Sequence, residues 1–243
     1  MFNQVDGKKY RFVIIFSDLF HYLLKDKLLI VNLCDKLVDL IPSLSKDTTI
    51  ILPTFNLKFY KTLVTGNSAC YITTGFLNKT LLKHLHFQRT KKPIGNYSVI
   101  GLDSKKILNI QQNSLFGKDS VINFLSTQST LGVGIGIDPK NFGWTTIHSC
   151  EEEIKVPYRY YKRFEGYNID TKQKVFENVY VRDLKMKYVC DESIIPKYLL
   201  EKKKILNFSY HGLNISFTNL RDHYLTGINI LKKDKYGLVK KSY

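Results

Sequence analysis

Residues 10–18, which read Tyr-Arg-Phe-Val-Ile-Ile-Phe-Ser-Asp, decide the fold class together with the two segments that follow them. The apolar run Tyr10–Phe16 predicts a strand that ends in the polar pair Ser17-Asp18. Apolar residues at helical spacing between Leu28 and Leu44 predict a helix, and the short β-branched run Asp47–Leu52, stopped by Pro53, predicts a second strand. A strand, a helix and a strand in this order are typical of an α/β layer structure with at least one parallel pair.

Further elements are expected along the rest of the chain. Strands are predicted at Tyr97–Leu102 and Leu131–Ile137, and the segment Gly117–Gln128 has a helical pattern. The charged, tyrosine-rich region Val156–Arg182 resembles antiparallel strands, and the last third combines a helix around Ile194–Lys203 with short strands. Because neither a repeat nor a Pro/Gly/Ser-rich linker interrupts residues 1–243, we expect a single domain.

The chain is strongly basic, with 37 lysines and arginines against 21 acidic residues and a net charge of +16. A positive field favours anionic partners such as nucleic acid, anionic lipid or a phosphorylated small molecule. The charges form short pairs rather than one long run, so most of them are expected on solvated faces. The first apolar run, Phe12–Phe16, is too short for a signal peptide or a membrane span. We therefore expect a cytoplasmic protein without membrane insertion.

The cysteines and histidines lack the spacing of a metal site. The four cysteines are widely separated and include no CxxC pair: Cys34, Cys70, Cys150 and Cys190. Reduced thiols in a cytosolic protein are therefore expected. His84 and His86 alternate, as they would on one face of a strand, but have no third ligand near them in the sequence. We predict that no metal is bound.

Alternating glycines distinguish the run Leu131-Gly-Val-Gly-Ile-Gly-Ile137. The spacing lacks the third glycine of a GxGxxG dinucleotide fingerprint, and no helical pattern follows directly, which disfavours a nicotinamide site. Gly132, Gly134 and Gly136 would instead leave one face of a strand bare, so that another backbone or a ligand could come close.

The side chains best suited to chemistry are concentrated in Gly143-Trp-Thr-Thr-Ile-His-Ser-Cys-Glu-Glu-Glu153. If a helical turn begins near Thr146, His148 shares a face with Glu151 and Glu152, three and four residues later. A carboxylate beside an imidazole can fix its tautomer, as a general base requires. The alternative is a helix N-terminus whose acidic residues complement the helix dipole.

Six stretches in order resemble the aminoglycoside 3-N-acetyltransferase family. They are Phe16-Ser17-Asp18-Leu19; Pro53-Thr54-Phe55; Gly75; Arg89-Thr90 with Pro93, Ser98 and Gly101; Phe116-Gly117 with Ser120; and Thr145, His148, Glu151 and Glu152 after Leu131-Gly132. The matches span about residues 10–165, and residues 166–243 are expected to complete the fold and the acceptor site. Two positions depart from the family pattern. Phe16 replaces a histidine, and Lys91-Lys92 replace the His-Pro pair of many members.

The resemblance implies a central mixed sheet flanked by helices, and direct transfer of an acetyl group from acetyl-CoA to an amine. It implies that a base takes the proton of the amine, and His148, oriented by Glu151, fills that role. The oxyanion needs hydrogen-bond donors, which are either backbone N–H groups or a hydroxyl such as that of Thr145. The expected coenzyme contacts are Ser17, Asp18, Leu19, Arg89, Thr90 and Ser98. The expected acceptor contacts are Thr54, Phe55, Glu152 and Tyr158.

The acceptor implied by the resemblance is an amino sugar. A +16 protein repels a polycation and attracts an anion, which favours a nucleotide-linked amino sugar for surface polysaccharide biosynthesis. The cluster Glu151–Glu153 keeps an aminoglycoside, and thus antibiotic resistance, as the alternative. O-acetylation and a longer acyl group also stay open. A basic module that binds nucleic acid or a membrane surface without catalysis would explain the charge but not the His-Glu pattern, so no nucleic-acid partner is expected. The oligomeric state is open, with a homodimer as one option.

Overall fold

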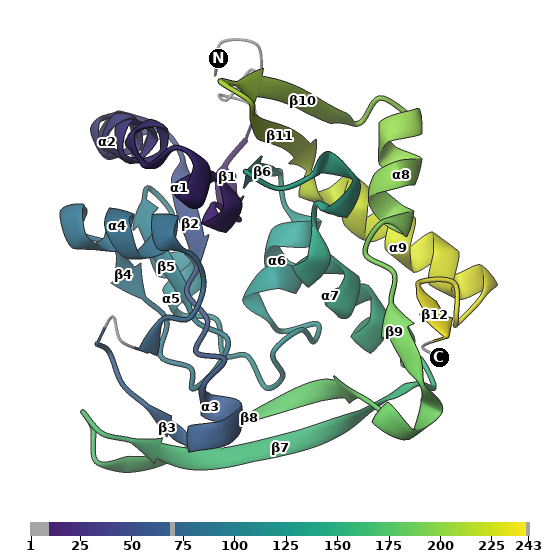
Figure 1. Ribbon diagram of the computed structural model, residues 1–243. Helices are drawn as coiled ribbons and strands as arrows, with labels where there is room; N and C mark the ends of the chain where they lie inside the picture. The colour runs from purple at the N-terminus through teal and green to yellow at the C-terminus, as the bar shows by residue number, and fades with distance from the viewer. Residues whose placement is uncertain (1–9, 69–70, 242–243) are drawn as a thin grey trace.

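A central mixed sheet with helices on both faces forms the body of the molecule (Figure 1). The computed structural model describes residues 10–68 and 71–241. Within these residues the sheet has seven strands in the order β10-β11-β6-β1-β2-β5-β4. Their bounds are β1 Phe12–Ser17, β2 Thr49–Pro53, β4 Gln88–Arg89, β5 Tyr97–Gly101, β6 Thr130–Ile135, β10 Ile205–Tyr210 and β11 Leu213–Asn219. The expected α/β class and mixed sheet are confirmed.

Strand β1 is parallel to both of its neighbours, β2 and β6, with Phe12 in register with Thr49 and with Thr130. The outer strand pairs are antiparallel. Side chains alternate along β1 between the two faces of the sheet: Val13 and Ile15 join one apolar cluster, while Phe12 and Ile14 join another. Because both faces are covered, the run is apolar throughout, as a buried parallel strand requires.

The helices have bounds α1 Phe20–Lys25, α2 Lys27–Leu44, α3 Phe59–Thr62, α4 Phe76–His84, α5 Ser104–Leu108, α6 Val121–Thr127, α7 Trp144–Ile154, α8 Ile194–Glu201 and α9 Leu220–Lys233. Helix α2 confirms the helix expected at Leu28–Leu44. The Asp26 carboxylate accepts a hydrogen bond from the Leu29 N–H at 2.9 Å and so caps its first turn. Its buried side chains recur every three or four residues: Ile30, Leu33, Cys34, Leu37 and Ile41.

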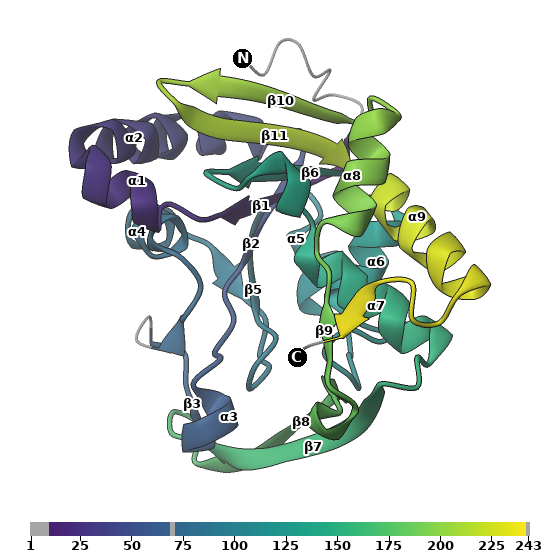
Figure 2. The same ribbon diagram turned by 45° about the vertical axis from the view of Figure 1, so that its right-hand side comes forward.

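A long hairpin crosses the end of the molecule opposite β10 (Figures 1 and 2). It consists of β7 Arg159–Asn168 and β8 Gln173–Arg182, with the two-residue strand β3 Val64–Thr65 parallel to β7. This confirms the antiparallel strands expected in region 156–182. A separate pair joins β9 Tyr188–Cys190 to β12 Val239–Lys241.

Several expectations were wrong in detail. Helix α9 has 14 residues, where only short strands were expected after residue 203. His84 ends helix α4 and His86 lies outside any strand, so the two histidines do not share a strand face. The glycine face of strand β6 is covered by a side chain of the protein itself and not by another backbone or a ligand: a Cβ at Gly134 would lie 2.9 Å from the ring of Phe142.

Three of the cysteines, Cys34, Cys150 and Cys190, are free thiols, and Cys70 lies outside the described residues. Within the described ranges, no group of three or more His, Cys, Asp or Glu side chains could hold a metal ion. Among the same residues, no helix is both long and apolar enough to cross a membrane.

Candidate active site

Helix α7 carries the His-Glu segment and begins directly after a glycine in the left-handed conformation. Gly143 has φ +104°, and a Cβ there would lie 2.3 Å from Nε2 of the buried His223 on helix α9. Only glycine tolerates both that φ value and that contact. The close approach places the first turn of α7, with Thr145, at the carboxyl end of strand β1, and His148 one turn further along the helix.

His148 and Glu151 meet as the spacing predicted. Nδ1 of His148 lies 2.8 Å from Oε2 of Glu151. The same carboxylate oxygen lies 2.9 Å from Nε of Arg159, the first residue of strand β7. Nη2 of Arg159 is 3.0 Å from His148 Nδ1, so this ring nitrogen is within reach of both a carboxylate and a guanidinium. The His148 side chain is 25% exposed, whereas that of Glu151 is fully buried.

The surroundings of Glu151 keep its carboxyl group ionised. Burial acts to raise its pKa, but the hydrogen bond with His148 and the charges of His148 and Arg159 outweigh burial, so the pKa lies below its ordinary value. A buried carboxylate that stays ionised can hold the imidazole in one orientation and stabilise its positive charge.

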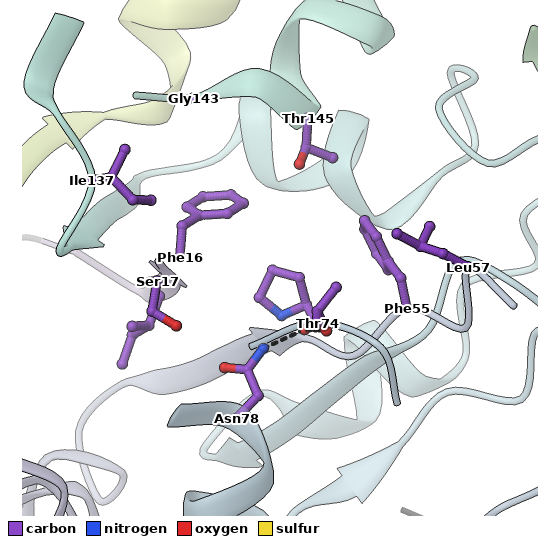
Figure 3. A pocket seen from close by; sticks show the side chains of 11 residues that line it. Phe16, Ser17, Phe55, Leu57, Thr74, Asn78, Ile137, Gly143 and Thr145 are labelled. Atoms are coloured by element: carbon purple, nitrogen blue, oxygen red, sulfur yellow. Dashed lines mark hydrogen bonds between the residues drawn. The ribbon is translucent and has the colours of Figure 1, made fainter. Parts of the chain in front are cut away.

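A cavity of about 210 Å³ opens where the parallel strands β1, β2 and β6 end. Ligands of α/β proteins bind at the carboxyl ends of parallel strands. Apolar side chains dominate the wall, and three residues expected in the site contribute to it: Ser17, Phe55 and Thr145. Figure 3 shows Phe16 and Phe55 on opposite sides of the cavity, with Thr145 between them at the α7 side. Phe16 is the residue that departs from the family's histidine.

Asn78 on helix α4 contributes a polar side chain to this wall. Its Nδ2 donates to the Pro53 carbonyl oxygen at 2.5 Å, and the Thr74 hydroxyl donates to the same oxygen at 2.6 Å. Since a carbonyl oxygen only accepts, these bonds fix which end of the amide is which. Within the described residues, Oδ1 of Asn78 is buried without a hydrogen-bond partner. In Figure 3 this oxygen lies on the side of Ser17.

A second pocket, of about 730 Å³, is lined by residues from the second half of helix α7 and is called the acidic pocket below. Glu152, one turn after His148, lines this pocket, and so does Gly117. The ring of Phe116, the residue before Gly117, has its centroid 5.1 Å from that of His148. The charged lining of the pocket is Asp119, Glu152, Glu153, Lys118 and Lys155. Burial raises the pKa of Glu152, although Ser114 and Tyr161 lie close enough to oppose the shift. In the described part of the chain, Oε2 of Glu152 is buried and has no hydrogen-bond partner.

A third hollow, of about 820 Å³, is basic. Arg89, Thr90, Lys91 and Lys92 line it, so two of the expected coenzyme contacts lie here, away from the apolar cavity. The guanidinium of Arg89 is already engaged, because it donates to the carbonyl oxygens of Thr54 at 2.8 Å and Gly66 at 3.2 Å. Burial lowers the pKa of Arg89 to about 10.

The remaining expected site residues lie apart from the three hollows. The hydroxyls of Thr54 and Ser98 are 3.1 Å apart inside the sheet, and both residues are fully buried. Asp18 is exposed and its carboxylate accepts from the Phe20 N–H at the start of α1. Leu19 belongs to the apolar core. Tyr158 packs against other tyrosines, with its ring centroid 5.7 Å from that of Tyr236.

Sequence reasoning missed Arg159 and Asn78. Arg159 is eleven positions from His148, beyond any helical spacing, and reaches the site only because the chain turns back between α7 and β7. Asn78 lies on helix α4, three residues after Gly75, and no side chain of this helix was expected in the site. In neither case does a local pattern mark the residue.

Comparisons with known proteins bear on this geometry. Neither a family model nor a curated protein sequence matches the chain. Among solved structures, AAC-VIa bound to sisomicin superposes with a TM-score of 0.73 at 13% identity, covering 96% of this chain and 94% of that one. Aminoglycoside acetyltransferase AAC(3)-IIb gives 0.72 at 11% identity, with 96% and 94% covered. The YokD protein from Bacillus subtilis gives 0.68 at 13% identity, with 96% and 90% covered. The chain therefore has the fold of the aminoglycoside acetyltransferases over nearly its whole length.

Proposed function

We propose that this chain is an acetyl-CoA-dependent N-acetyltransferase that acts on an amino group of a sugar. The observation that carries the proposal is the position of His148. Its imidazole is held by the buried carboxylate of Glu151 at 2.8 Å, on a helix whose Thr145 lines an apolar cavity and whose Glu152 lines an acidic pocket, on the fold of aminoglycoside acetyltransferases. The apolar cavity suits a thioester donor, and the acidic pocket suits an amine.

His148 serves as the general base. We assign the Nδ1 proton to the hydrogen bond with Glu151, because the carboxylate oxygen can only accept. Nε2 then has a free lone pair and takes the proton of the attacking amine. Glu151 stabilises the imidazolium that forms, and Arg159 keeps Glu151 ionised. We assign the hydrogen bond to the oxyanion to the hydroxyl of Thr145, one turn earlier on α7. Holding both substrates in attack geometry supplies a further part of the acceleration.

The end of the coenzyme arm next to the thioester is assigned to the apolar cavity. An acyl-CoA carries amide N–H groups on an otherwise largely apolar arm next to the thioester. The cavity matches this chemistry, because its wall is mainly apolar and Oδ1 of Asn78 is an unsatisfied buried acceptor in the described chain. Leaving such an atom unpaired costs free energy that an amide donor would recover. The basic hollow with Lys91 and Lys92 is assigned to the coenzyme phosphates.

The acceptor is assigned to the acidic pocket, and its local charge supports a cationic amino sugar of the aminoglycoside type. Glu152 is buried with a raised pKa and an unpaired oxygen, which an ammonium group would satisfy. Two of the solved structures with this fold are complexes of AAC(3)-IVa with a gentamicin and with apramycin.

A nucleotide-linked amino sugar is the second candidate. The net charge of +16 supports it, because long-range attraction raises the local concentration of an anion. The two candidates are therefore supported by charges at different distances. The net charge of the whole chain favours an anion, and the side chains that line the acidic pocket favour a cation.

A kinetic comparison tests both candidates. Acetyl-CoA consumption is measured with aminoglycosides and with nucleotide-linked amino sugars side by side, at low and high salt. We expect the higher kcat/KM for an aminoglycoside. A higher kcat/KM for the nucleotide sugar, falling as salt increases, would reverse the order of the two candidates. An absence of consumption with both classes would contradict the proposed activity.

A further inference from the structure

The wall and the volume of the apolar cavity indicate which acyl groups could fit it. The wall is formed largely by Ile15, Phe16, Pro53, Phe55, Leu57 and Ile137, at the carboxyl ends of the parallel strands and the loops beyond them. Thr145, one turn before His148 on helix α7, lines the cavity, whereas Glu152, one turn after His148, lines the acidic pocket. Because the proposed function assigns the amine to the acidic pocket, the apolar space is assigned to the donor.

Apolar side chains continue from the cavity to the surface around it. Leu57 lines the cavity and is still 47% exposed. Phe76 is 42% exposed and follows Gly75, where a Cβ would lie 3.2 Å from the Ser17 hydroxyl of the cavity wall. Phe20, three residues after Ser17, is 65% exposed. Exposed apolar side chains that gather beside a hollow are typical of a site for an apolar ligand.

The volume exceeds what an acetyl group needs. An apolar cavity of about 150 Å³ holds a benzene molecule, and this cavity measures about 210 Å³. The histidine expected from the family would have brought a polar ring to the wall. Phe16 instead presents an apolar ring, whose centroid is 6.1 Å from that of Phe142. Both the volume of the cavity and the apolar ring of Phe16 favour an acyl chain with several methylene groups over a single methyl group.

We propose that the donor is an acyl-CoA with an acyl chain of about four to six carbons, whose tail fills this cavity while Asn78 Oδ1 accepts the nearest amide N–H of the coenzyme arm. The inference rests on the proposed function and extends its donor beyond acetyl. In the transfer, the amine nitrogen forms a bond to the thioester carbon and the carbon–sulfur bond breaks. The amine proton passes to His148 Nε2, and the coenzyme leaves as a thiolate that takes up a proton.

Binding separates chain lengths without an acceptor. Calorimetry of the full chain with acetyl-CoA, butyryl-CoA and hexanoyl-CoA measures three dissociation constants. Each buried methylene is worth about fourfold in affinity, so butyryl-CoA, with two more methylenes, should bind roughly fifteenfold more tightly than acetyl-CoA. Leu57→Trp narrows the cavity and should weaken hexanoyl-CoA more than acetyl-CoA. Leu206→Trp is the matched control, because Leu206 is 46% exposed on strand β10, outside the cavity wall, and should leave all three constants unchanged.

A second variant tests Phe16, the residue that differs from the family pattern. Phe16→His restores the family's residue and should reduce the preference for butyryl-CoA over acetyl-CoA severalfold while the protein stays folded by circular dichroism. Acetyl-CoA binding as tightly as both longer donors, or Leu57→Trp affecting all three equally, would overturn the inference and leave the proposed activity standing. Failure of all three donors to bind would instead contradict the proposed use of an acyl-CoA, and the inference with it.

Discussion

Arg159 Nε lies 2.9 Å from Glu151 Oε2, and the two side chains are 10% and 0% exposed. The guanidinium also donates from Nη1 to the Tyr180 carbonyl oxygen at 3.0 Å, which anchors it to strand β8. The pair therefore connects helix α7 to the β7–β8 hairpin at the position of His148. A buried carboxylate beside an imidazole needs such a partner, because an unpaired charge at this depth would be protonated or would open the structure.

Replacing one member of this pair should cost more than replacing both. Arg159→Met leaves the Glu151 carboxylate buried with His148 as its remaining ionic partner, and we expect the free energy of unfolding to fall by about 3–5 kcal/mol. The double variant Glu151→Gln, Arg159→Met removes both charges and should be more stable than Arg159→Met alone. Urea unfolding of the four proteins of this cycle measures the coupling.

The same cycle separates stability from catalysis. The double variant should regain stability but not activity, because the imidazole loses its orienting carboxylate. Exposed Arg163 on the same strand provides the control, since its partner Glu165 is also exposed and such pairs contribute little. Strict additivity of the two substitutions at 151 and 159 would show that the pair is not coupled.

Glu152→Gln should weaken the acceptor and spare the donor. If an ammonium group of the acceptor binds the Glu152 carboxylate, its loss should raise the KM of a cationic acceptor roughly tenfold or more, as expected for a hydrogen bond to a charged group. The KM of acetyl-CoA should stay within twofold. Glu201→Gln, at an exposed position on helix α8, is the control. An equal rise for a nucleotide-linked sugar would show that Glu152 does not discriminate by charge.

The elements that could be predicted from sequence are those whose local pattern agrees with their burial. Strand β1 is apolar at successive positions because both of its faces are covered, and α2 has an apolar stripe because one face is covered. Helix α9 was missed because glycine, threonine and asparagine interrupt its pattern in Leu220–Lys233. Its buried Gly227 faces Cys150, where a Cβ would lie 2.7 Å from the sulfur. Contact with α7 thus overrides local helix propensity.

The candidate site divides in the same way. The contact between His148 and Glu151 follows from helical spacing, so the sequence predicts it. Thr54 and Ser98 match a family motif, yet they point into the sheet toward each other. Asn78 and Arg159 enter the site through tertiary packing, which no spacing rule contains. Motif matches thus identify the segments that lie near the site, whereas tertiary packing determines which of their side chains line the cavity and the pockets.

His223 should make the fold sensitive to acid. It is fully buried, its Nε2 donates to the Phe142 carbonyl oxygen at 2.8 Å, and burial lowers its pKa from 6.5 to about 4. Between these values the unfolded chain binds the extra proton, so stability falls as the pH drops from about 6.5 to 4. The shift corresponds to about 3 kcal/mol.

The control for this prediction is His223→Gln, whose amide can donate to the same carbonyl oxygen without titrating. Urea midpoints at pH 7 and pH 4.5 should differ more for the wild type than for the variant. Burial raises the pKa of Glu152 and of Glu177, which acts in the opposite direction but equally in both proteins. Equal pH dependence of the two proteins would show that the pKa of His223 is the same in the folded and the unfolded chain.

His148→Ala tests the proposed base. Removing a general base lowers kcat by roughly 10² to 10⁴, and the KM of acetyl-CoA should change little, because the assigned coenzyme contacts lie in other segments. Glu151→Gln should lower kcat less, since it keeps the base and removes only its orientation and charge support. The wild-type pH profile should have an acidic limb that is absent in His148→Ala, because protonation of the imidazole removes the lone pair that accepts the amine proton. His84→Ala, at an exposed position ending helix α4, is the matched control and should behave as the wild type.

The competing explanation makes His148 a packing residue against Phe116, in which case the alanine variant would lose stability but keep its activity per folded molecule. Measuring kcat on protein whose folding is checked by circular dichroism distinguishes the two, and a folded His148→Ala enzyme with near-wild-type kcat would refute the mechanism.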